Sequence, residues 1–505
     1  MASTTIKPQI DFLEEPMRLY IDGRFVETEG SLASVDPATG RTLADAPLAT
    51  EREVDAAVTA AARAFDGWRF TPPTQRARLL WTLADLLDAN KDEFATIEVL
   101  DNGKPMWEAQ AVDIALTIEL LRYYAGWATK IEGKVLPNSI PGMFTVAKRE
   151  PVGVVAAITP WNFPLLEVAY KLGPALAAGC TIVIKPSELA PLSTLRLMQL
   201  VDEAGFPPGV INVVIGGPEV GAALVRHPGV QKVAFTGQTA TGKEIMRTAV
   251  DGLKRVTLEL GGKSPCLVAG DANLDVAAAR IVWGKFLNAG QTCVAPDHVL
   301  VERRAAAPLL AALVRRIREF YGEDAAASPD YGRIATERHA ARFERLLAGQ
   351  RIHYGGRVDV AQRYVEPTIV LDPSPDSALM QEEIFGPVLP VIAVDDMGAA
   401  MRLVAARPKP LALYVFTRDE ALADAVRDSL SAGTVCVNDA VIFMVSPELP
   451  FGGVGASGMG RYSGWYGFET FSHMKPVMTR SLRFDVPIRY PPYNDTKARL
   501  LKLVR

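Results

Sequence analysis

The chain has 505 residues, of which 49% are hydrophobic and 22% are charged, and its formal net charge is −4. This length exceeds what one hydrophobic core can organise, so we expect two or three domains of an ordinary globular protein. The small negative charge and the lack of a basic block argue against nucleic acid as a partner. No uncharged apolar run reaches the roughly 18 residues of a membrane-spanning helix, so no integral membrane segment is predicted.

Location and metal chemistry follow from the N-terminal segment and from the cysteines and histidines. Residues 1–16 lack the apolar core of a secretory signal peptide, so we expect a cytoplasmic protein. The four cysteines lie far apart without a Cys-x-x-Cys pair, which predicts reduced thiols. None of the five histidines pairs at metal-ligand spacing, so no metal site is predicted and a catalytic base should be a carboxylate.

The first part of the chain predicts a hairpin followed by helices. Alternation around Asp22 and Gly23 predicts a hairpin at residues 18–26 that forms a small entry sheet. Apolar residues at helical spacing predict three helices, with Thr50 and Thr71 as caps of the first two. These helices are expected at residues 51–68, 74–100 and 109–128. Prolines and a strand-like run then predict an excursion from the body at residues 133–151.

Five short apolar strands alternate with helices between residues 152 and 260, which predicts a parallel, doubly wound sheet. The strands are expected at 152–158, 181–184, 210–215, 232–235 and 255–258, and the helices near 165–178, 192–203, 220–225 and 242–249. Ligands bind at the carboxyl ends of such strands. A similar alternation from 261 to about 438 predicts a second α/β domain.

Three polar side chains stand where these elements end. Cys293 lies among small and neutral polar residues beside turn formers, Glu259 ends an apolar run before two glycines, and Asn162 follows the first strand of the sheet. A thiol, a carboxylate and an amide donor are the parts of acyl transfer: nucleophile, general base and oxyanion stabiliser. Taken singly, each also has an ordinary structural explanation, such as an inert buried thiol or a carboxylate paired with a surface lysine.

Seven blocks that include these residues resemble the aldehyde dehydrogenase superfamily, in the family's order and over most of the chain. They are 160–164 (PWNFP), 185–188 (KPSE), 235–242, 258–265 (LELGGKSP), 290–293 (GQTC), 382–387 (EEIFGP) and 450–453 (PFGG). The resemblance implies an α/β fold with a doubly wound parallel cofactor-binding sheet, a second α/β catalytic domain and a small β oligomerisation arm. The implied boundaries are 1–130 and 151–260 for the cofactor-binding domain, 261–456 for the catalytic domain, and 131–150 with 475–505 for the oligomerisation arm and the C-terminal tail.

The resemblance also implies NAD as the cofactor, with NADP possible. No Gly-x-Gly-x-x-Gly follows the first strand, but residues 237–242 precede a predicted helix whose N-terminus suits a pyrophosphate. Glu188 would repel the extra phosphate of NADP, although relatives with the same four residues accept both cofactors. The predicted cofactor-binding residues are Thr159, Pro160, Trp161, Lys185, Ser187, Glu188, Gly221, Phe235, Thr236, Gly237, Gln238, Gly242, Leu260, Glu383 and Phe385.

The implied reaction oxidises an aldehyde to its acid. Cys293 attacks the aldehyde, Asn162 and the Cys293 N–H hold the oxyanion, hydride leaves for the nicotinamide, and Glu259 activates water to hydrolyse the thioester. A CoA-acylating semialdehyde dehydrogenase and a non-catalytic, NAD-binding or structural relative remain alternatives. Glu259 favours water as the acyl acceptor.

Substrate and oligomeric state stay open at this point. The N-terminal hairpin resembles the betaine and phenylacetaldehyde type of enzyme, which is usually tetrameric. The C-terminal part resembles the class 3 and fatty-aldehyde branch, which is usually dimeric. A homodimer or homotetramer is therefore expected. Medium-chain aliphatic or aromatic aldehydes are favoured. Glu167 favours polar or cationic aldehydes if it faces the pocket, and is otherwise a solvated helix residue. Candidate pocket residues are Phe163, Glu167, Tyr170, Thr292, Val294, Phe443 and Phe451. The basic amphipathic tail 497–505 suits a membrane surface, the protein body or another subunit.

Overall fold

The computed structural model describes residues 10–138, 142–483, 485 and 487–503. The beginning of the N-terminal segment, three residues of the predicted arm and the last two residues of the basic tail lie outside the described residues. No helix in the described part of the chain is long and apolar enough to cross a membrane.

An eight-stranded sheet forms the core of the first half of the molecule, with the strand order β2-β1-β9-β8-β7-β10-β11-β21, in which β21 (Gly458–Met459) is a short antiparallel edge strand. Its five central strands are mutually parallel, which confirms the predicted doubly wound sheet. They are β9 (Ile211–Val213), β8 (Thr181–Lys185), β7 (Val154–Ile158), β10 (Lys232–Gly237) and β11 (Arg255–Leu260). All residues of β7 and β8 are buried, as the central strands of a helix-covered parallel sheet must be.

The N-terminal hairpin extends this sheet instead of forming a separate one. Strands β1 (Leu19–Ile21) and β2 (Arg24–Val26) pair around Asp22 and Gly23, which both have positive φ. Tyr20 of β1 then pairs antiparallel with Val213 of β9. The predicted hairpin is therefore confirmed, but its strands form the edge of the main sheet and not a small sheet, because β1 covers the edge that β9 would otherwise leave unpaired. A separate ribbon forms later, from β3 (Gly30–Val35) and β4 (Thr42–Leu48).

The first helix begins as predicted, whereas the second is interrupted. In α2 (Glu51–Trp68), Thr50 and Glu53 form a reciprocal capping box. The predicted helix 74–100 is two helices, α3 (Pro73–Ala89) and α4 (Lys91–Asn102). They separate at Asn90, whose side chain donates to the carbonyl of Leu86 and competes with the backbone ladder.

Two further helix predictions need correction. Thr71 does not cap α3, because Pro72 holds the cap position and Thr71 donates its hydroxyl to the Gly67 carbonyl. The region predicted as one helix at 109–128 begins with a π-helical stretch, η1 (Ala109–Ile114), between α5 (Met106–Glu108) and α6 (Ala115–Trp127). Such π-helical turns are frequent near functional sites.

A helix follows each of the parallel strands β7, β8, β9 and β10 after a short connection. They are α7 (Pro164–Ala178), α8 (Leu192–Glu203), α9 (Pro218–Arg226) and α10 (Thr239–Val250). Helix α10 begins three residues before the predicted start at Gly242. Gly242 therefore lies inside the first helical turn, where an added Cβ would be 2.5 Å from the Leu260 side chain.

A seven-stranded sheet forms the core of the second half, with the order β14-β17-β18-β13-β12-β19-β20. All of its strands except β14 (Ile352–Tyr354) run parallel, as predicted for a second α/β unit. The parallel strands are β17 (Thr368–Leu371), β18 (Val388–Val394), β13 (His298–Glu302), β12 (Pro265–Val268), β19 (Ala412–Phe416) and β20 (Thr434–Val437). Its helices include α11 (Leu274–Phe286), α12 (Arg303–Tyr321), α13 (Glu337–Leu347), α15 (Met397–Ala405) and α16 (Glu420–Ser429).

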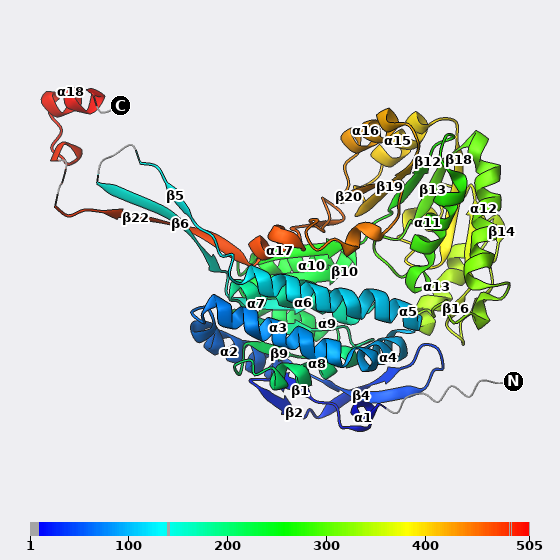
Figure 1. Ribbon diagram of the computed structural model, residues 1–505, viewed down its shortest axis with the longest axis horizontal. Helices are drawn as coiled ribbons and strands as arrows, with labels where there is room; N and C mark the ends of the chain where they lie inside the picture. Colours follow the sequence, from blue (N-terminus) through cyan, green and yellow to red (C-terminus); the bar gives the residue numbers. More distant parts are fainter. Residues whose placement is uncertain (1–9, 139–141, 484, 486, 504–505) are drawn as a thin grey trace.

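A three-stranded arm extends away from both halves (Figure 1). It consists of β5 (Lys134–Leu136), β6 (Met143–Pro151) and β22 (Ser472–Arg480). Strand β22 pairs antiparallel with the whole of β6, so residues more than 320 positions apart form one ribbon. Helix α18 (Asp495–Leu503) lies at the far end of this arm (Figure 1).

Candidate active site

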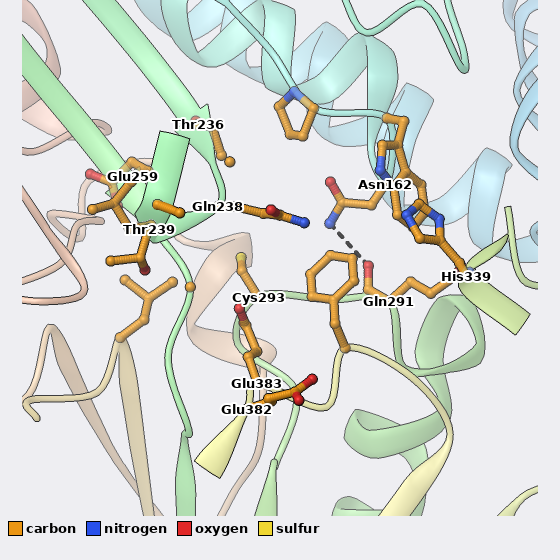
Figure 2. Close-up of a pocket in the computed structure, with 18 of the residues that line it drawn as sticks. Asn162, Thr236, Gln238, Thr239, Glu259, Gln291, Cys293, His339, Glu382 and Glu383 are labelled. Carbon is orange, nitrogen blue, oxygen red and sulfur yellow. Dashed lines mark hydrogen bonds between the residues drawn. The ribbon is translucent and has the colours of Figure 1, made fainter. Parts of the chain in front are cut away.

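A cavity of about 520 Å³ is lined by residues from both halves of the molecule. The first half contributes the carboxyl ends of β7, β10 and β11, and the second half contributes the loop after α11, helix α13 and the segment 382–385 (Figure 2). Its lining residues are Pro160, Trp161, Asn162, Glu167, Thr236, Gly237, Gln238, Thr239, Ala240, Glu259, Leu260, Gly261, Gln291, Cys293, His339, Arg342, Phe343, Glu382, Glu383, Phe385 and Leu411. The three predicted catalytic residues all belong to this set.

The loop that carries Cys293 leaves α11 through a left-handed turn. Asn288, Ala289 and Gly290 have φ of 50°, 52° and 77°. The first two carry a side chain, and such a conformation costs about 1–3 kcal/mol for each residue. At Gly290, an added Cβ would lie 2.4 Å from the backbone of Gly386. The turn therefore depends on surrounding contacts, and it brings a half-buried, free Cys293 thiol to the cavity.

The environment of the thiol is negative as well as buried. Burial raises the pKa of the Cys293 thiol well above its ordinary value, and the nearby carboxylates of Glu167, Glu383 and Glu259 raise it further. The neutral form of the Cys293 thiol is consequently favoured. A cation brought close to the sulfur would lower its pKa and favour the nucleophilic thiolate.

Asn162 lies opposite this loop. It lies between β7 and α7, which begins at Pro164. Proline suits the first position of a helix because it has no backbone N–H, and an N–H at that position would have no partner within the helix. The Asn162 side-chain amide donates to the carbonyl of Gln291, at 2.9 Å (Figure 2). Asn162 and Cys293 are thus held on facing walls of one cavity, as an oxyanion donor and its nucleophile must be.

Glu259 is a buried carboxylate on β11, only 2% exposed. Neither of its side-chain oxygens makes a hydrogen bond of normal geometry to the described residues. Burial raises the pKa of Glu259 well above the ordinary value, and the charge of Lys171 partly opposes this shift. An unpaired buried carboxylate is costly for the fold, so its place on a cavity wall is typical of a group kept for proton transfer.

Glu167 also lines the cavity, so its alternative as a solvated helix residue is wrong. It is 6% exposed and forms an ion pair with Lys171, whose Nζ lies 2.8 Å from its carboxylate. The same ammonium donates to the hydroxyl of Thr236 at 2.8 Å. Because Lys171 neutralises Glu167, the pair presents no net charge to a cationic aldehyde.

The remaining pocket candidates lie outside the lining of this cavity. Tyr170, Phe451 and Phe443 form a row of rings, with centroids 6.1 Å and 6.4 Å apart. Phe163 instead stacks under the Lys104 ammonium, and Val294 is fully buried with its carbonyl accepting the Tyr414 hydroxyl. Thr292 donates its hydroxyl to the carbonyl of Leu287, at 3.4 Å.

The predicted cofactor residues divide into two groups. Those on the cavity wall are Pro160, Trp161, Thr236, Gly237, Gln238, Leu260, Glu383 and Phe385. The rest lie outside its lining: Thr159, Lys185, Ser187, Glu188, Gly221, Phe235 and Gly242. In this second group, Lys185 pairs with Glu188 at 3.3 Å on the loop after β8, and an added Cβ at Gly221 would lie 3.8 Å from Lys185.

Helix α13 contributes residues that the sequence reasoning missed. His339 stacks on Trp161 with ring centroids 5.4 Å apart, and burial lowers the pKa of His339 to about 4, so it is neutral at pH 7. Arg342 donates to the Ile384 carbonyl at 2.8 Å and pairs with Glu382, which holds the segment that carries Glu383. No local pattern around residues 337–347 marks them, because they meet the cavity only through tertiary packing.

Comparison with known proteins agrees with this arrangement. Residues 25–477 match the aldehyde dehydrogenase family. The chain is 44% identical over 350 residues to the aldehyde dehydrogenase family 3 member A2 of Rattus norvegicus, which covers 69% of this chain and 72% of that protein. Solved structures with the same fold include two aldehyde dehydrogenases in complex with NAD+.

The first of these is an aldehyde dehydrogenase from Bacillus cereus, with 40% identity, a TM-score of 0.89 and coverage of 94% of this chain and 99% of that one. The second is the betaine aldehyde dehydrogenase of Staphylococcus aureus, with 33% identity, a TM-score of 0.88 and coverage of 93% and 96%. With the family match and the cavity that joins Cys293, Asn162 and Glu259, the conclusion is that this chain belongs to the aldehyde dehydrogenase family.

Proposed function

We propose that this protein oxidises an aldehyde to its carboxylic acid with NAD+ and water. The observation that carries the proposal is that a free thiol, an amide donor and an unpaired carboxylate line one cavity, in a chain of this family. Cys293 forms a thiohemiacetal with the aldehyde, and Asn162 with the Cys293 N–H stabilises its oxyanion. Loss of hydride converts this adduct to a thioester, and Glu259 takes a proton from the water that hydrolyses it.

NAD+ supplies the hydride acceptor when bound, and the residues present fit it. The first amides of α10 have no side-chain cap, and Gln238, Thr239 and Ala240 at this helix start line the cavity; free amides at a helix N-terminus suit a pyrophosphate. Glu383 and Phe385 line the cavity near Cys293 and suit a nicotinamide riboside. Lys185 and Glu188 suit the hydroxyls of the adenosine ribose.

The two sheets and the arm have distinct roles in this proposal. Residues 1–130 and 151–260 form the cofactor domain, 261–456 the catalytic domain, and 131–150 with 475–505 the arm and tail. The arm exposes Val135, Phe144 and Met478, and apolar side chains on a projecting ribbon favour pairing with another copy of the chain. A homodimer or homotetramer follows, and the four free cysteines support a cytoplasmic location.

The proposed substrates are medium-chain aliphatic or aromatic aldehydes. The row formed by Tyr170, Phe451 and Phe443 supports an apolar substrate, and the neutralised Glu167 gives no preference for a cationic one. The test is turnover of acetaldehyde, hexanal, decanal, benzaldehyde and betaine aldehyde with NAD+ or NADP+. Highest kcat/KM for hexanal, decanal or benzaldehyde is expected, and a preference for betaine aldehyde would contradict this assignment.

A CoA-acylating activity is the second candidate, because another acceptor can take the acyl group from the same thioester. The unpaired carboxylate of Glu259 favours water. Product analysis with and without CoA decides between them: free acid at an unchanged rate is expected, whereas an acyl-CoA product would replace the hydrolytic assignment.

Asn162→Ala is expected to lower kcat/KM for aldehyde oxidation about 100-fold, the scale of one lost oxyanion donor. The reason is that the alanine variant lacks the only side-chain donor assigned to the oxyanion. NAD+ affinity should stay within about threefold, measured by quenching of protein fluorescence. Unchanged turnover would leave Asn162 a structural residue.

Glu188→Gln is expected to shift the preference between cofactors toward NADP+ by about 10-fold or more, measured as the ratio of the two kcat/KM values. The substitution removes a negative charge that would face the extra phosphate of NADP+. In the wild-type protein the Lys185 ammonium lies 3.3 Å from the Glu188 carboxylate, and in the variant this ammonium can bind the phosphate instead. A ratio that does not change would remove Glu188 from the ribose site.

A further inference from the structure

A cluster of buried charges that the proposed mechanism does not use lies directly behind the cavity. Lys104 forms an ion pair with Asp113 and lies 4.0 Å from Glu98, and all three side chains are fully buried. Glu108 is also buried, and burial raises its pKa to about 8. Asp113 belongs to the π-helical turn η1, which follows Glu108 directly. Burying several charged groups around one ammonium costs folding free energy unless each group has hydrogen-bond or ion-pair partners. The partners of this cluster lie in the two loops that carry Asn162 and Cys293.

On one side, this cluster holds the segment that carries Asn162. The Lys104 ammonium donates to the backbone carbonyl of Asn162 at 3.1 Å and lies 4.3 Å from the centre of the Phe163 ring. Glu98 accepts the backbone N–H of Leu165, at 3.1 Å, in the first turn of α7. The cluster thus fixes the backbone from which the Asn162 amide projects.

On the other side, the same cluster holds the loop that carries Cys293. Glu108 accepts the backbone N–H of Asn288 at 2.8 Å, at the first left-handed residue of that loop. The side-chain amide of Asn288 then donates to the Asn162 carbonyl, also at 2.8 Å. One carbonyl therefore receives hydrogen bonds from both Lys104 and Asn288, and it links the two loops.

We propose that Glu108, Lys104 and Asn288 are positioning residues that fix the oxyanion donor Asn162 and the nucleophile Cys293 relative to each other. This inference rests on the proposed function. A misplacement of about 1 Å between reacting groups can cost on the order of 100-fold in rate. The left-handed turn stores backbone strain, so the loop should relax to another conformation when its anchor is removed.

The decisive variants are Glu108→Ala, which deletes the acceptor for the Asn288 N–H, and Asn288→Gly. The glycine keeps the left-handed backbone accessible and removes the buried Asn288 side chain, whose amide makes the bond to the Asn162 carbonyl. Glu108→Gln is the conservative variant, because its amide oxygen can still accept the N–H. The matched control is Asp101→Ala: Asp101 is equally buried, its pKa is raised to about 7, and its carboxylate accepts hydrogen bonds from the Ser34 hydroxyl and the Leu192 N–H, which belong to neither loop.

The measurement is single-turnover formation of NADH, with enzyme in excess over hexanal and saturating NAD+. The enzyme concentration is raised until the observed rate constant no longer changes, so that unfolded protein lowers the concentration of sites without altering that rate constant. We expect Glu108→Ala and Asn288→Gly to lower the rate constant about 10-fold or more, Glu108→Gln to retain it within about threefold, and Asp101→Ala within about twofold. Melting temperatures should fall for both alanine variants.

Rate constants of Glu108→Ala and Asn288→Gly within twofold of wild type would overturn the inference, and so would an equal loss in Asp101→Ala. If Glu108→Ala does not fold, Asn288→Gly decides alone. A failure of the proposed function itself is recognised differently, because the wild-type enzyme would then form no NADH from any aldehyde.

Discussion

Cys293→Ala is expected to abolish NADH formation from every aldehyde, with a loss of roughly 10⁴-fold or more that reaches the assay background. Among the described residues that line the cavity, Cys293 alone carries a thiol, and Glu167 is held in an ion pair with Lys171. Loss of a nucleophile removes the covalent route altogether. The measurement is steady-state turnover of hexanal and benzaldehyde with saturating NAD+.

The control variant is Cys436→Ala. Cys436 is also a free, half-buried thiol, but it lies on β20, outside the cavity lining. It should keep turnover within about twofold, and Cys293→Ala should keep NAD+ binding, because its backbone is unchanged. Dehydrogenase turnover that survives in Cys293→Ala would refute the covalent mechanism.

Glu259→Gln is expected to slow hydrolysis of the thioester about 100-fold or more, the usual scale for a lost general base. The first turnover should still produce NADH, since acylation of Cys293 does not need water. Rapid mixing should therefore show a burst of one NADH per active site, followed by a slow steady phase. Normal steady turnover of the variant would exclude Glu259 from deacylation.

The pH dependence of the wild-type enzyme provides a second test of Glu259. Burial raises the pKa of Glu259, so the ionised form that acts as a base becomes abundant only at a higher pH than for an ordinary glutamate. The rate of deacylation should therefore increase with pH over a range that lies above 4.5, the ordinary pKa of a glutamate, and it should decrease at lower pH as the Glu259 carboxylate is protonated. Glu259→Gln should lose this dependence while keeping its low rate.

Local sequence determined the elements that build the two sheets. Helix α8 spans the predicted residues, strand β8 begins at the predicted Thr181 and ends one residue later than predicted, and Thr50 caps α2 as predicted. These features depend on residues within a few positions of one another, and the hydrophobic period of each element follows from its own geometry. The catalytic candidates were accessible too, since Asn162 and Cys293 each follow a recognisable element and Glu259 lies in the last two residues of one.

Only the tertiary structure decided which distant residues meet at the site. The hairpin of β1 and β2 joins the main sheet because β9 needed a partner, and α13 brings His339 and Arg342 to the cavity. Glu98 lies in a predicted helix, and Lys104 and Glu108 lie between two predicted helices, where no local pattern marks them; yet burial makes all three partners of the loops of Asn162 and Cys293. A charged side chain in a helical pattern is normally solvated. Its contacts become visible only when packing removes the water and each buried polar group must find a partner.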